Sequence, residues 1–468
     1  MKRQKSRSKP NKPAHKSAQQ LPTEAVELHI DSISHDGRGV GRFAGKVTFV
    51  SNALPGETVL AKLTESKSKY NLADAEQILT PSADRIEPFC PHYQQCGGCD
   101  MQHLSSERQL ELKQTHVLEQ LQRIGQTTPE DVLAPLRSAP SHYRRSARIG
   151  INQLSNGDPI VGFRRKSSHL LCQIDSCPVL DKRLENIFSV TREQLEALGD
   201  IKHITQLDID LGDQDGFLNV HHKKPLSPEA IAAFQTIATQ YQLTLNFQGK
   251  ETIKNDRKTR EAAASYQLND LSLSFHSGDF IQVNAGINQQ MIEQAIALLA
   301  PTKEDQILDL FCGLGNFTLP LTSRGAQLTG VEGSEAMVLQ AQHNAQNNNL
   351  SSCEFHCANL AEDITGQAWY KKPYNKLVLD PPRTGAQQLI NQICALKAEL
   401  ILYISCNPGA LARDTLALKE QGYKLSKFLV MDMFPQTHHI ESMALFVRGK
   451  KPKATKKVIS GKKLWSTR

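Results

Sequence analysis

Short apolar segments separated by turn residues make up the first part of the chain. In residues 24–80, β-type segments such as "VELHIDSI", "KVTFVS" and "ETVLAKL" alternate with turn signals that include Gly45 and the Pro55-Gly56 pair. Several short strands at this spacing predict a small barrel of oligonucleotide-binding type over residues 21–80. Barrels of this size are common, so the pattern by itself indicates no function.

A Pro-, Gly- and Cys-rich break at residues 88–103 separates the predicted barrel from a segment with helical spacing, which Gly125 ends. From about 135 to 275 the pattern is mostly of β type, with hairpin signals at Asn156-Gly157 and Asp215-Gly216 and one helix over 228–241. We therefore expect residues 81–275 to form a central α+β domain. The apolar face of the first helix is expected to hold Leu110, Gln114, Val117, Leu118, Leu121 and Ile124.

Strand and helix patterns alternate from residue 285 to residue 447. Apolar segments such as "QILDLF", "AQLTGVE", "NKLVLD" and "ELILYIS" are spaced by amphipathic helices, one of them over 334–347. This rhythm is typical of a doubly wound parallel sheet, so residues 276–448 are expected to form a Rossmann-like α/β domain.

Charge is distributed unevenly along the 468 residues, a length that predicts two to four domains. Residues 1–20 carry seven basic side chains and residues 448–468 carry nine, with no acidic side chain in either segment. Removing these sixteen charges from the net +7 leaves −9 for residues 21–447. We expect two basic disordered tails, 1–20 and 449–468, which either add phosphate affinity for a large RNA or only keep the protein in solution.

No apolar segment approaches the roughly 20 residues of a membrane helix, and the basic N-terminus lacks the apolar stretch of a signal peptide. A soluble, cytoplasmic protein without membrane contact is therefore expected. In a reducing compartment, the ten cysteines indicate metal or catalytic sites where they cluster, not a disulfide framework.

A glycine-rich turn follows the predicted strand "ILDLF". Gly313 and Gly315 would let the backbone approach a ligand, and Thr318 stands where a dinucleotide fingerprint has its third glycine. An acid, Asp309, precedes Gly313 by four residues, and a glycine pair alone is also compatible with an ordinary turn. The next predicted strands end at Glu332, Asn359 and Asp380. Because ligands of such sheets lie at the carboxyl ends of the strands, the pattern favours a class I site for S-adenosylmethionine.

Cys406 follows the strand after Asp380, so the two should emerge side by side at one edge of the sheet. A single cysteine is more often packing than nucleophile, and Glu441, beside His438 and His439, could be a surface acid. Pyrimidine C5, however, becomes nucleophilic only after addition at C6, which a thiolate can perform, and a carboxylate can then remove the C5 proton. A methyl-donor site with Cys406 and Glu441 is the minimum set for this route.

Five motifs closely resemble RNA uracil-C5 methyltransferases of the RlmD (RumA) type, which act on 23S ribosomal RNA. They are "DFIQVN" at 279–284, "DLFCGLGNFTLP", "DPPRTGA", "ISCNPGALARD" and "DMFPQTHHIESMALF". The resemblance implies that Cys406 is the C6 nucleophile and Glu441 the base, and that residues 23–80 form a TRAM domain, an RNA-binding barrel. The S-adenosylmethionine positions that it implies are Gln282, Phe311, Asn316, Glu332, Asn359 and Asp380.

The spacing Cys90-x5-Cys96-x2-Cys99 is a compact ligand set that needs a fourth member, for which Cys172 and Cys177 are candidates. Four thiolates suit zinc or a [4Fe–4S] cluster equally well.

Zinc with a histidine ligand, His92 or His103, is a further alternative. The resemblance implies a [4Fe–4S] cluster, and "CPVL" matches its distal ligand at Cys177. The role expected for it is structural and RNA-orienting, since methylation needs no electron.

The predicted activity is methylation of C5 of a specific uridine in 23S ribosomal RNA, free or in precursor particles, by a monomer. The same chemistry on another 23S uridine or on tRNA is the first alternative. A non-catalytic, metal-containing RNA-binding protein is an alternative of another class, although it would need neither Cys406 nor Glu441. The "DPPR" motif also resembles that of amino-methylating enzymes, but Arg383 replaces their aromatic residue.

Overall fold

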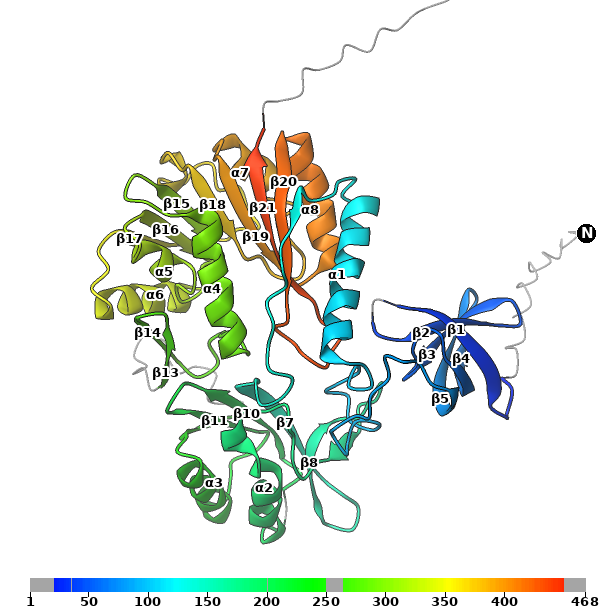
Figure 1. The fold of residues 1–468 in the computed structure, drawn as a ribbon. Helices are drawn as coiled ribbons and strands as arrows, with labels where there is room; N and C mark the ends of the chain where they lie inside the picture. Colours follow the sequence, from blue (N-terminus) through cyan, green and yellow to red (C-terminus); the bar gives the residue numbers. More distant parts are fainter. Residues whose placement is uncertain (1–20, 35, 200, 250–263, 450–468) are drawn as a thin grey trace, which may run out of the picture. The chain divides into compact units, whose positions relative to one another are not determined.

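The computed structural model describes residues 21–34, 36–199, 201–249 and 264–449 (Figure 1). The predicted basic tails, 1–20 and 449–468, lie outside these residues except for Gly449. The chain divides after Arg85 into two compact units. Among the described residues, no helix has the length and apolar character needed to cross a membrane.

The first unit is a closed five-stranded barrel, which confirms the predicted barrel. Its strands follow one another around the barrel in the order β1-β2-β3-β5-β4. Leu28 of β1 and its partner Val59 of β4 belong to the barrel core, as do Ile30 and Ala61 two residues further along each strand, because alternate residues of a strand face one side. The strands are β1 (Val26–Ile33), β2 (Gly39–Phe43), β3 (Lys46–Ser51), β4 (Thr58–Ser66) and β5 (Tyr70–Thr80).

A buried ion pair joins Arg85, the last residue of this unit, to Glu57. Glu57 is fully buried, and its carboxylate lies 2.5 Å from Nε of Arg85. Burial alone would raise the pKa of Glu57, but hydrogen bonds from Arg85 and from the backbone amides of Leu54 and Ser82 outweigh it, so the pKa is lowered.

The second unit contains a six-stranded sheet of order β12-β11-β10-β7-β8-β9, built from the central part of the chain. Helices α2 (Ile187–Glu196) and α3 (Pro228–Gln240) share its apolar core. The helix predicted over 228–241 is confirmed as α3; Ser227 caps it and Pro228 begins it. The strands are β7 (Ser146–Gln153), β8 (Pro159–Arg164), β9 (Leu171–Gln173), β10 (Ile204–Leu211), β11 (Gly216–His222) and β12 (Thr244–Gln248).

An eight-stranded sheet of order β17-β16-β15-β18-β19-β21-β20-β6 forms the C-terminal α/β domain. Strand β21 pairs antiparallel with both neighbours, whereas the other pairings are parallel, which confirms the doubly wound prediction. The strands are β15 (Gln306–Leu310), β16 (Gln327–Glu332), β17 (Cys353–Cys357), β18 (Lys376–Leu379), β19 (Leu400–Ser405), β20 (Tyr423–Met431), β21 (Glu441–Arg448) and the short β6 (Asp131–Val132).

Helices cover both faces of this sheet (Figure 1). Ile307 of β15 packs with α4, α5 and α6 on one side, and the next residue, Leu308, packs with α1, α7 and α8 on the other. A two-stranded hairpin of β13 (Ala264–Leu268) and β14 (Leu271–Phe275) joins the first of these cores. The helices are α1 (Ser106–Arg123), α4 (Ala285–Leu299), α5 (Thr318–Thr322), α6 (Glu335–Asn347), α7 (Ile390–Ala395) and α8 (Pro408–Glu420).

Helix α1 and strand β6 precede the central sheet in the chain but pack with the C-terminal sheet. Leu110, Val117 and Leu121 of α1 belong to the same core as α7 and α8, and β6 extends the sheet beside β20. Gly125 ends the helical segment as predicted, and a Cβ there would lie 2.7 Å from the carbonyl oxygen of Leu121. The α/β domain is thus built from segments that precede the central sheet in the chain and from segments that follow it.

Candidate active site

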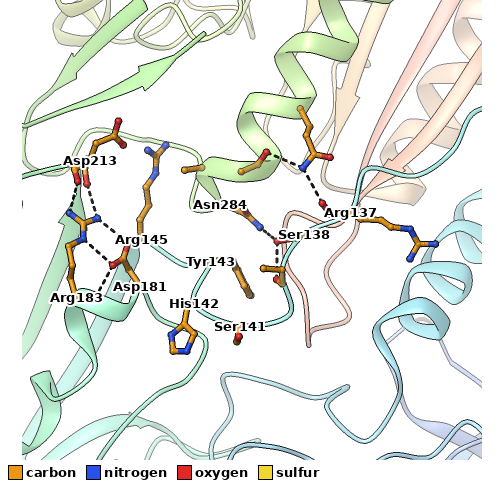
Figure 2. Close-up of a pocket in the computed structure, with 15 residues that line it drawn as sticks. Arg137, Ser138, Ser141, His142, Tyr143, Arg145, Asp181, Arg183, Asp213 and Asn284 are labelled. Atoms are coloured by element: carbon orange, nitrogen blue, oxygen red, sulfur yellow. Dashed lines mark hydrogen bonds and ion pairs between the residues drawn. The ribbon is translucent and has the colours of Figure 1, made fainter. Parts of the chain in front are cut away.

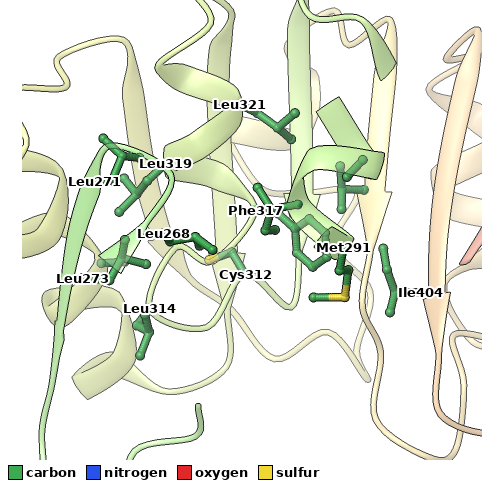
Figure 3. Packing of buried hydrophobic residues seen from close by; sticks show 14 of the residues in the cluster. Leu268, Leu271, Leu273, Met291, Cys312, Leu314, Phe317, Leu319, Leu321 and Ile404 are labelled. Atoms are coloured by element: carbon green, nitrogen blue, oxygen red, sulfur yellow. The ribbon is translucent and has the colours of Figure 1, made fainter. Parts of the chain in front are cut away.

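The turn after β15 has the backbone geometry of a ligand cradle. Phe311, Gly313 and Gly315 have φ values of 67°, 56° and 97°. A Cβ at Gly315 would lie 2.9 Å from Cγ of Leu319, so a glycine is required there for space as well as for conformation. Leu314, Phe317, Leu319 and Leu321 anchor the turn in the apolar core beside Met291 and Ile404 (Figure 3).

Two acids fix this turn. The carboxylate of Glu332, at the end of β16, accepts hydrogen bonds from the amides of Gly313 (3.3 Å) and Ser334 (3.1 Å). Asp309 is fully buried and accepts a 2.6 Å hydrogen bond from the hydroxyl of Thr318, whereas its other oxygen is buried without a partner in the described chain. Burial raises the pKa of Asp309 to about 7. A polar ligand at the turn would suit this arrangement.

Two further predicted donor-binding residues, Asn359 and Asn316, already have partners within the chain. Asn359 follows β17 with its side chain exposed and bonded to Glu362 (2.7 Å). The amide of Asn316 is already engaged by the hydroxyl of Tyr266 (3.1 Å) and by Asn288. Asn316 therefore ties the turn to β13 and α4.

Cys406 lies between the end of β19 and the start of α8. The next residue, Asn407, caps the helix, since its Oδ1 accepts from the amides of Gly409 (3.0 Å) and Ala410 (3.2 Å). Its Nδ2 donates to the carbonyl oxygen of Arg383 (3.0 Å), so the two motifs "DPPR" and "SCNP" are held together. A thiol at a helix N-terminus is placed where a thiolate is electrostatically favoured.

Strand register brings Glu441 to Cys406. Strands β19 and β21 pair antiparallel with Ser405 opposite Ser442, and the hydroxyl of Ser442 donates to the carbonyl oxygen of Ser405 (3.2 Å). Continuing this register by one residue places Cys406 opposite Glu441.

The pKa values show that these groups share one environment. Burial, and then the carboxylates of Glu441 and Asp380, raise the pKa of Cys406 to about 11, while Arg383 opposes the rise. Burial, and then Asp380, raise the pKa of Glu441 well above its usual range, again against Arg383. Burial raises the pKa of Asp380 to about 7. A thiol, two carboxyl groups and a guanidinium therefore meet at the carboxyl edge of the sheet.

The loop before Glu441 is held by the chain around the cysteine-rich segment. The carbonyl oxygen of Gln436 accepts from the amides of Asp100 and Met101 (3.0 Å each), and His438 pairs with Asp100 through its Nδ1 and its backbone amide. The side chains of Gln109 and Gln436 also bond to each other (3.0 Å). Sequence reasoning noted His438 but not these partners, because they lie more than three hundred residues away in the chain.

Buried groups near this loop reinforce it. Lys113 of α1 forms a buried ion pair with Asp432 (3.0 Å). Burial, and then the charges of His438 and Arg383, lower the pKa of His439 to about 4, so His439 is neutral at physiological pH. The charge of Arg383 thus lowers the pKa values of His439, Cys406 and Glu441. The sequence alone did not assign this role to Arg383.

The sequence of the chain was compared with family models and with known proteins. The tRNA (Uracil-5-)-methyltransferase family model matches residues 105–449, and the TRAM domain model matches residues 19–75. A 23S rRNA (uracil(1939)-C(5))-methyltransferase RlmD from Hahella chejuensis is 42% identical over 437 residues, covering 91% of this chain and 98% of that protein. The protein of the same name from Vibrio parahaemolyticus is 40% identical over 428 residues, covering 91% and 97%.

The chain belongs to the RNA uracil-C5 methyltransferase family.

The fold agrees with this assignment. The Pyrococcus abyssi tRNA (uracil-54, C5)-methyltransferase, solved in complex with S-adenosyl-L-homocysteine, superposes with a TM-score of 0.69 at 23% identity, covering 90% of this chain and all of that one. The barrel of this methyltransferase is thus a TRAM domain, and its C-terminal sheet has the fold of S-adenosylmethionine-dependent enzymes.

Between the two segments that match family models, the methyltransferase carries its cysteine-rich segment. Each pair among Cys90, Cys96, Cys99 and Cys177 interacts electrostatically, so the four thiols lie together. Burial raises the pKa of Cys96 to about 11 and that of Cys99 to about 12. Cys172 interacts in this way with Cys90 and Cys96.

Each of the two histidines that could replace a thiolate has one ring nitrogen engaged in a hydrogen bond. Nδ1 of His103 is bonded to the hydroxyl of Tyr93 (2.5 Å), and Nε2 of His92 accepts from the amide of Asp175 (3.4 Å). In the described chain, no three His, Cys, Asp or Glu side chains are arranged with the geometry of a metal site.

Proposed function

We propose that this methyltransferase methylates C5 of a uridine in 23S ribosomal RNA, with Cys406 as the nucleophile and Glu441 as the base. The observation that carries the proposal is the strand register that brings Cys406 and Glu441 face to face at the ligand-binding edge of the sheet. The two relatives named above, both 23S rRNA enzymes, are each aligned over 91% of this chain, which supports the choice of RNA.

The reaction begins with addition of the Cys406 sulfur to C6 of the uracil. The thiol proton leaves to solvent, a carbon–sulfur bond forms, and the electrons of the C5–C6 double bond move toward the C4 carbonyl oxygen. The α8 N-terminus and Arg383 favour the thiolate, whereas the carboxylates of Glu441 and Asp380 oppose it.

Elimination completes the reaction. S-adenosylmethionine, when bound, supplies the electrophilic methyl group that C5 accepts, and its sulfur keeps the electrons of the broken S–CH3 bond, which leaves S-adenosylhomocysteine. The carboxylate of Glu441 then takes the C5 proton, the C5–C6 double bond forms again, and the sulfur of Cys406 leaves as a thiolate. A carboxylate whose pKa is raised is a stronger base than an ordinary one, which suits Glu441 to this step.

The methyl donor is assigned to the edge formed by the turn after β15 and the ends of β16, β17 and β18. The positive-φ turn, the amide-bound carboxylate of Glu332 and the orphan oxygen of Asp309 fit a polar ligand there. The residues proposed to hold the donor are Gln282, Phe311, Asn316, Glu332, Asn359 and Asp380.

Substrate choice is tested by mapping 5-methyluridine in ribosomal RNA and tRNA from cells that lack the gene. We expect one 23S uridine to lose its methyl group, and purified enzyme to restore it on a transcript of that region. The TRAM barrel supports an RNA substrate but does not distinguish rRNA from tRNA. Loss of methylation in tRNA alone would favour the alternative substrate and overturn the ribosomal assignment.

We further propose that Cys90, Cys96, Cys99 and Cys177 hold a [4Fe–4S] cluster. Four mutually interacting thiols, of which Cys96 is buried and the other three are half-buried, have the donor chemistry of such a site, because clusters of this type are bound by four thiolates. The hydrogen bonds of Asp100 and Met101 to Gln436 would connect such a cluster with the loop that precedes Glu441. Its role would be to hold this loop.

Metal content tests the cluster. Protein purified without oxygen should be brown and contain about four iron atoms per chain. Cys96→Ser should lose most of this iron, whereas Cys172→Ser, a change at a neighbouring buried thiol, should retain it. Colourless protein that contains zinc, or equal iron in the two variants, would contradict the proposal.

A further inference from the structure

A cavity of about 530 Å³ lies between the start of α4 and the central sheet. Its walls come from the segment 137–145 that leads into β7, from Asp181 and Arg183, from Gly212 and Asp213, and from the first turn of α4 (Figure 2). None of these residues has a role in the reaction proposed above.

Arg145 supplies two buried donors to this cavity. Its side chain is 3% exposed, its Nε donates to the carbonyl oxygen of Gln282 (2.7 Å), and its guanidinium lies 4.4 Å from the ring centre of Tyr266. Nη1 and Nη2 are buried and have no hydrogen-bond partner in the described chain. Burial lowers the pKa of Arg145, and the attraction of Tyr266, Asp213 and Asp210 opposes this shift only in part. Two parallel N–H groups of this kind match two oxygens of one phosphate.

The first turn of α4 supplies backbone donors to the same cavity. Asn284 caps the helix, and its Oδ1 accepts from the amide of Ile287 (3.1 Å). The amides of Ala285 and Gly286, which line the cavity, are left without an intrahelical acceptor. The positive end of a 15-residue helix thus faces the cavity that holds the buried guanidinium.

The acids that line the cavity are engaged by other groups of the chain, although Asp213, together with Asp210, also attracts the charge of Arg145. Asp181 is paired with Arg183 (3.0 Å), which also donates to the backbone oxygens of Gly212 and Asp213. The carboxylate of Asp213 accepts from the amide of Gln267 (2.7 Å). Arg145 and the α4 amides therefore remain available to an anion.

We propose that this cavity binds a phosphate of the RNA strand, with Nη1 and Nη2 of Arg145 and the amides of Ala285 and Gly286 donating to its oxygens. The choice of RNA as the source of the phosphate rests on the proposed function. Arg145 contacts the backbone of Gln282, and Tyr266 beneath it donates to Asn316. The bound phosphate would therefore position the RNA strand directly beside the proposed methyl-donor site.

A pair of variants at Ala285 tests the proposal. Ala285 is exposed in the first turn, so Ala285→Glu adds a carboxylate where helices tolerate or prefer one, and folding should be preserved. The added charge should repel the phosphate, whereas Ala285→Gln has the same size without the charge. Arg324→Gln, at an exposed arginine outside the cavity, changes the net charge of the protein by the same one unit as Ala285→Glu. It therefore controls for a general loss of electrostatic attraction to RNA.

Binding is measured with a 23S RNA fragment over a range of KCl concentrations. Ala285→Glu should weaken binding about tenfold at low salt and reduce the slope of log K against log salt by about one phosphate contact. Ala285→Gln and Arg324→Gln should stay within about twofold of the unchanged protein. Equal affinity and slope for the Glu and Gln variants at residue 285 would overturn the proposal.

Inorganic phosphate and methyl transfer are measured in parallel. If inorganic phosphate binds in a manner that depends on residue 285 while RNA affinity does not, the cavity is a free-anion site and the RNA assignment is wrong. If RNA binding depends on residue 285 but no methyl group is transferred, the proposed reaction fails and the phosphate site stands. An unchanged protein that binds no RNA would overturn both.

Discussion

Replacement of Cys406 by alanine should lower the rate of uridine methylation by at least about 10⁴-fold. Without the sulfur there is no addition at C6, and C5 stays too weak a nucleophile to accept a methyl group. The thiol of Cys312 cannot substitute, because it is buried in the core beneath the glycine turn (Figure 3). Methyl transfer to a 23S fragment is measured with labelled donor.

A second measurement for Cys406→Ala uses RNA that contains 5-fluorouridine. The unchanged enzyme should form a covalent adduct that survives denaturation, because C5 carries fluorine and has no proton for the base to remove. The variant should form none. Cys394→Ala removes a thiol from α7, away from the site, and should keep both activity and adduct. An adduct that persists in Cys406→Ala would show that another group is the nucleophile.

Replacement of Glu441 by glutamine should separate addition from elimination. Cys406 can still attack C6 and C5 can still be methylated, but the C5 proton has no base. Turnover should fall by about 10²–10⁴-fold, and a covalent complex that carries the labelled methyl group should accumulate. The matched control is Glu420→Gln, at an exposed acid at the end of α8. Release of free methylated RNA at the normal rate would refute the role of Glu441.

The same variant changes the titration of Cys406 in a defined direction. The carboxylate of Glu441 helps to raise the pKa of this thiol to about 11, so its neutral replacement should lower that pKa. Alkylation of Cys406 at pH 9, followed by mass spectrometry, should therefore be faster in Glu441→Gln than in the unchanged enzyme. A change in exposure alone would alter the rate at all pH values without moving the pH profile.

Local pattern was sufficient to predict the elements of the α/β domain and the edge at which its ligands bind. Strand β19 is an apolar segment that ends before Asn407-Pro408, and a capping residue followed by proline is a common way to begin a helix. The carboxyl ends of parallel strands meet at one edge, so strand order along the chain was enough to place Asp380 and Cys406 together. The family motifs pointed to the same residues.

Contacts between distant segments could not be predicted in this way. Helix α1 was expected to belong to the central domain, since it precedes that domain in the chain, but its apolar face packs beside α8. The attachment of Asp100 to His438, and the two Nη atoms of Arg145 that lack a partner in the described chain, likewise depend on how distant segments pack. No spacing of residues along the chain carries that information.

The sequence by itself thus determined the barrel, the doubly wound sheet, the family and the choice of Cys406 as the proposed nucleophile, because each follows from periodicity, capping or motif. The motifs also indicated Glu441 as the proposed base, but only the tertiary structure decided how this carboxylate meets the thiol. The register of β19 against β21 sets Glu441 opposite Cys406, and an antiparallel register is chosen by the packing of both sheet faces, not by the residues of either strand alone.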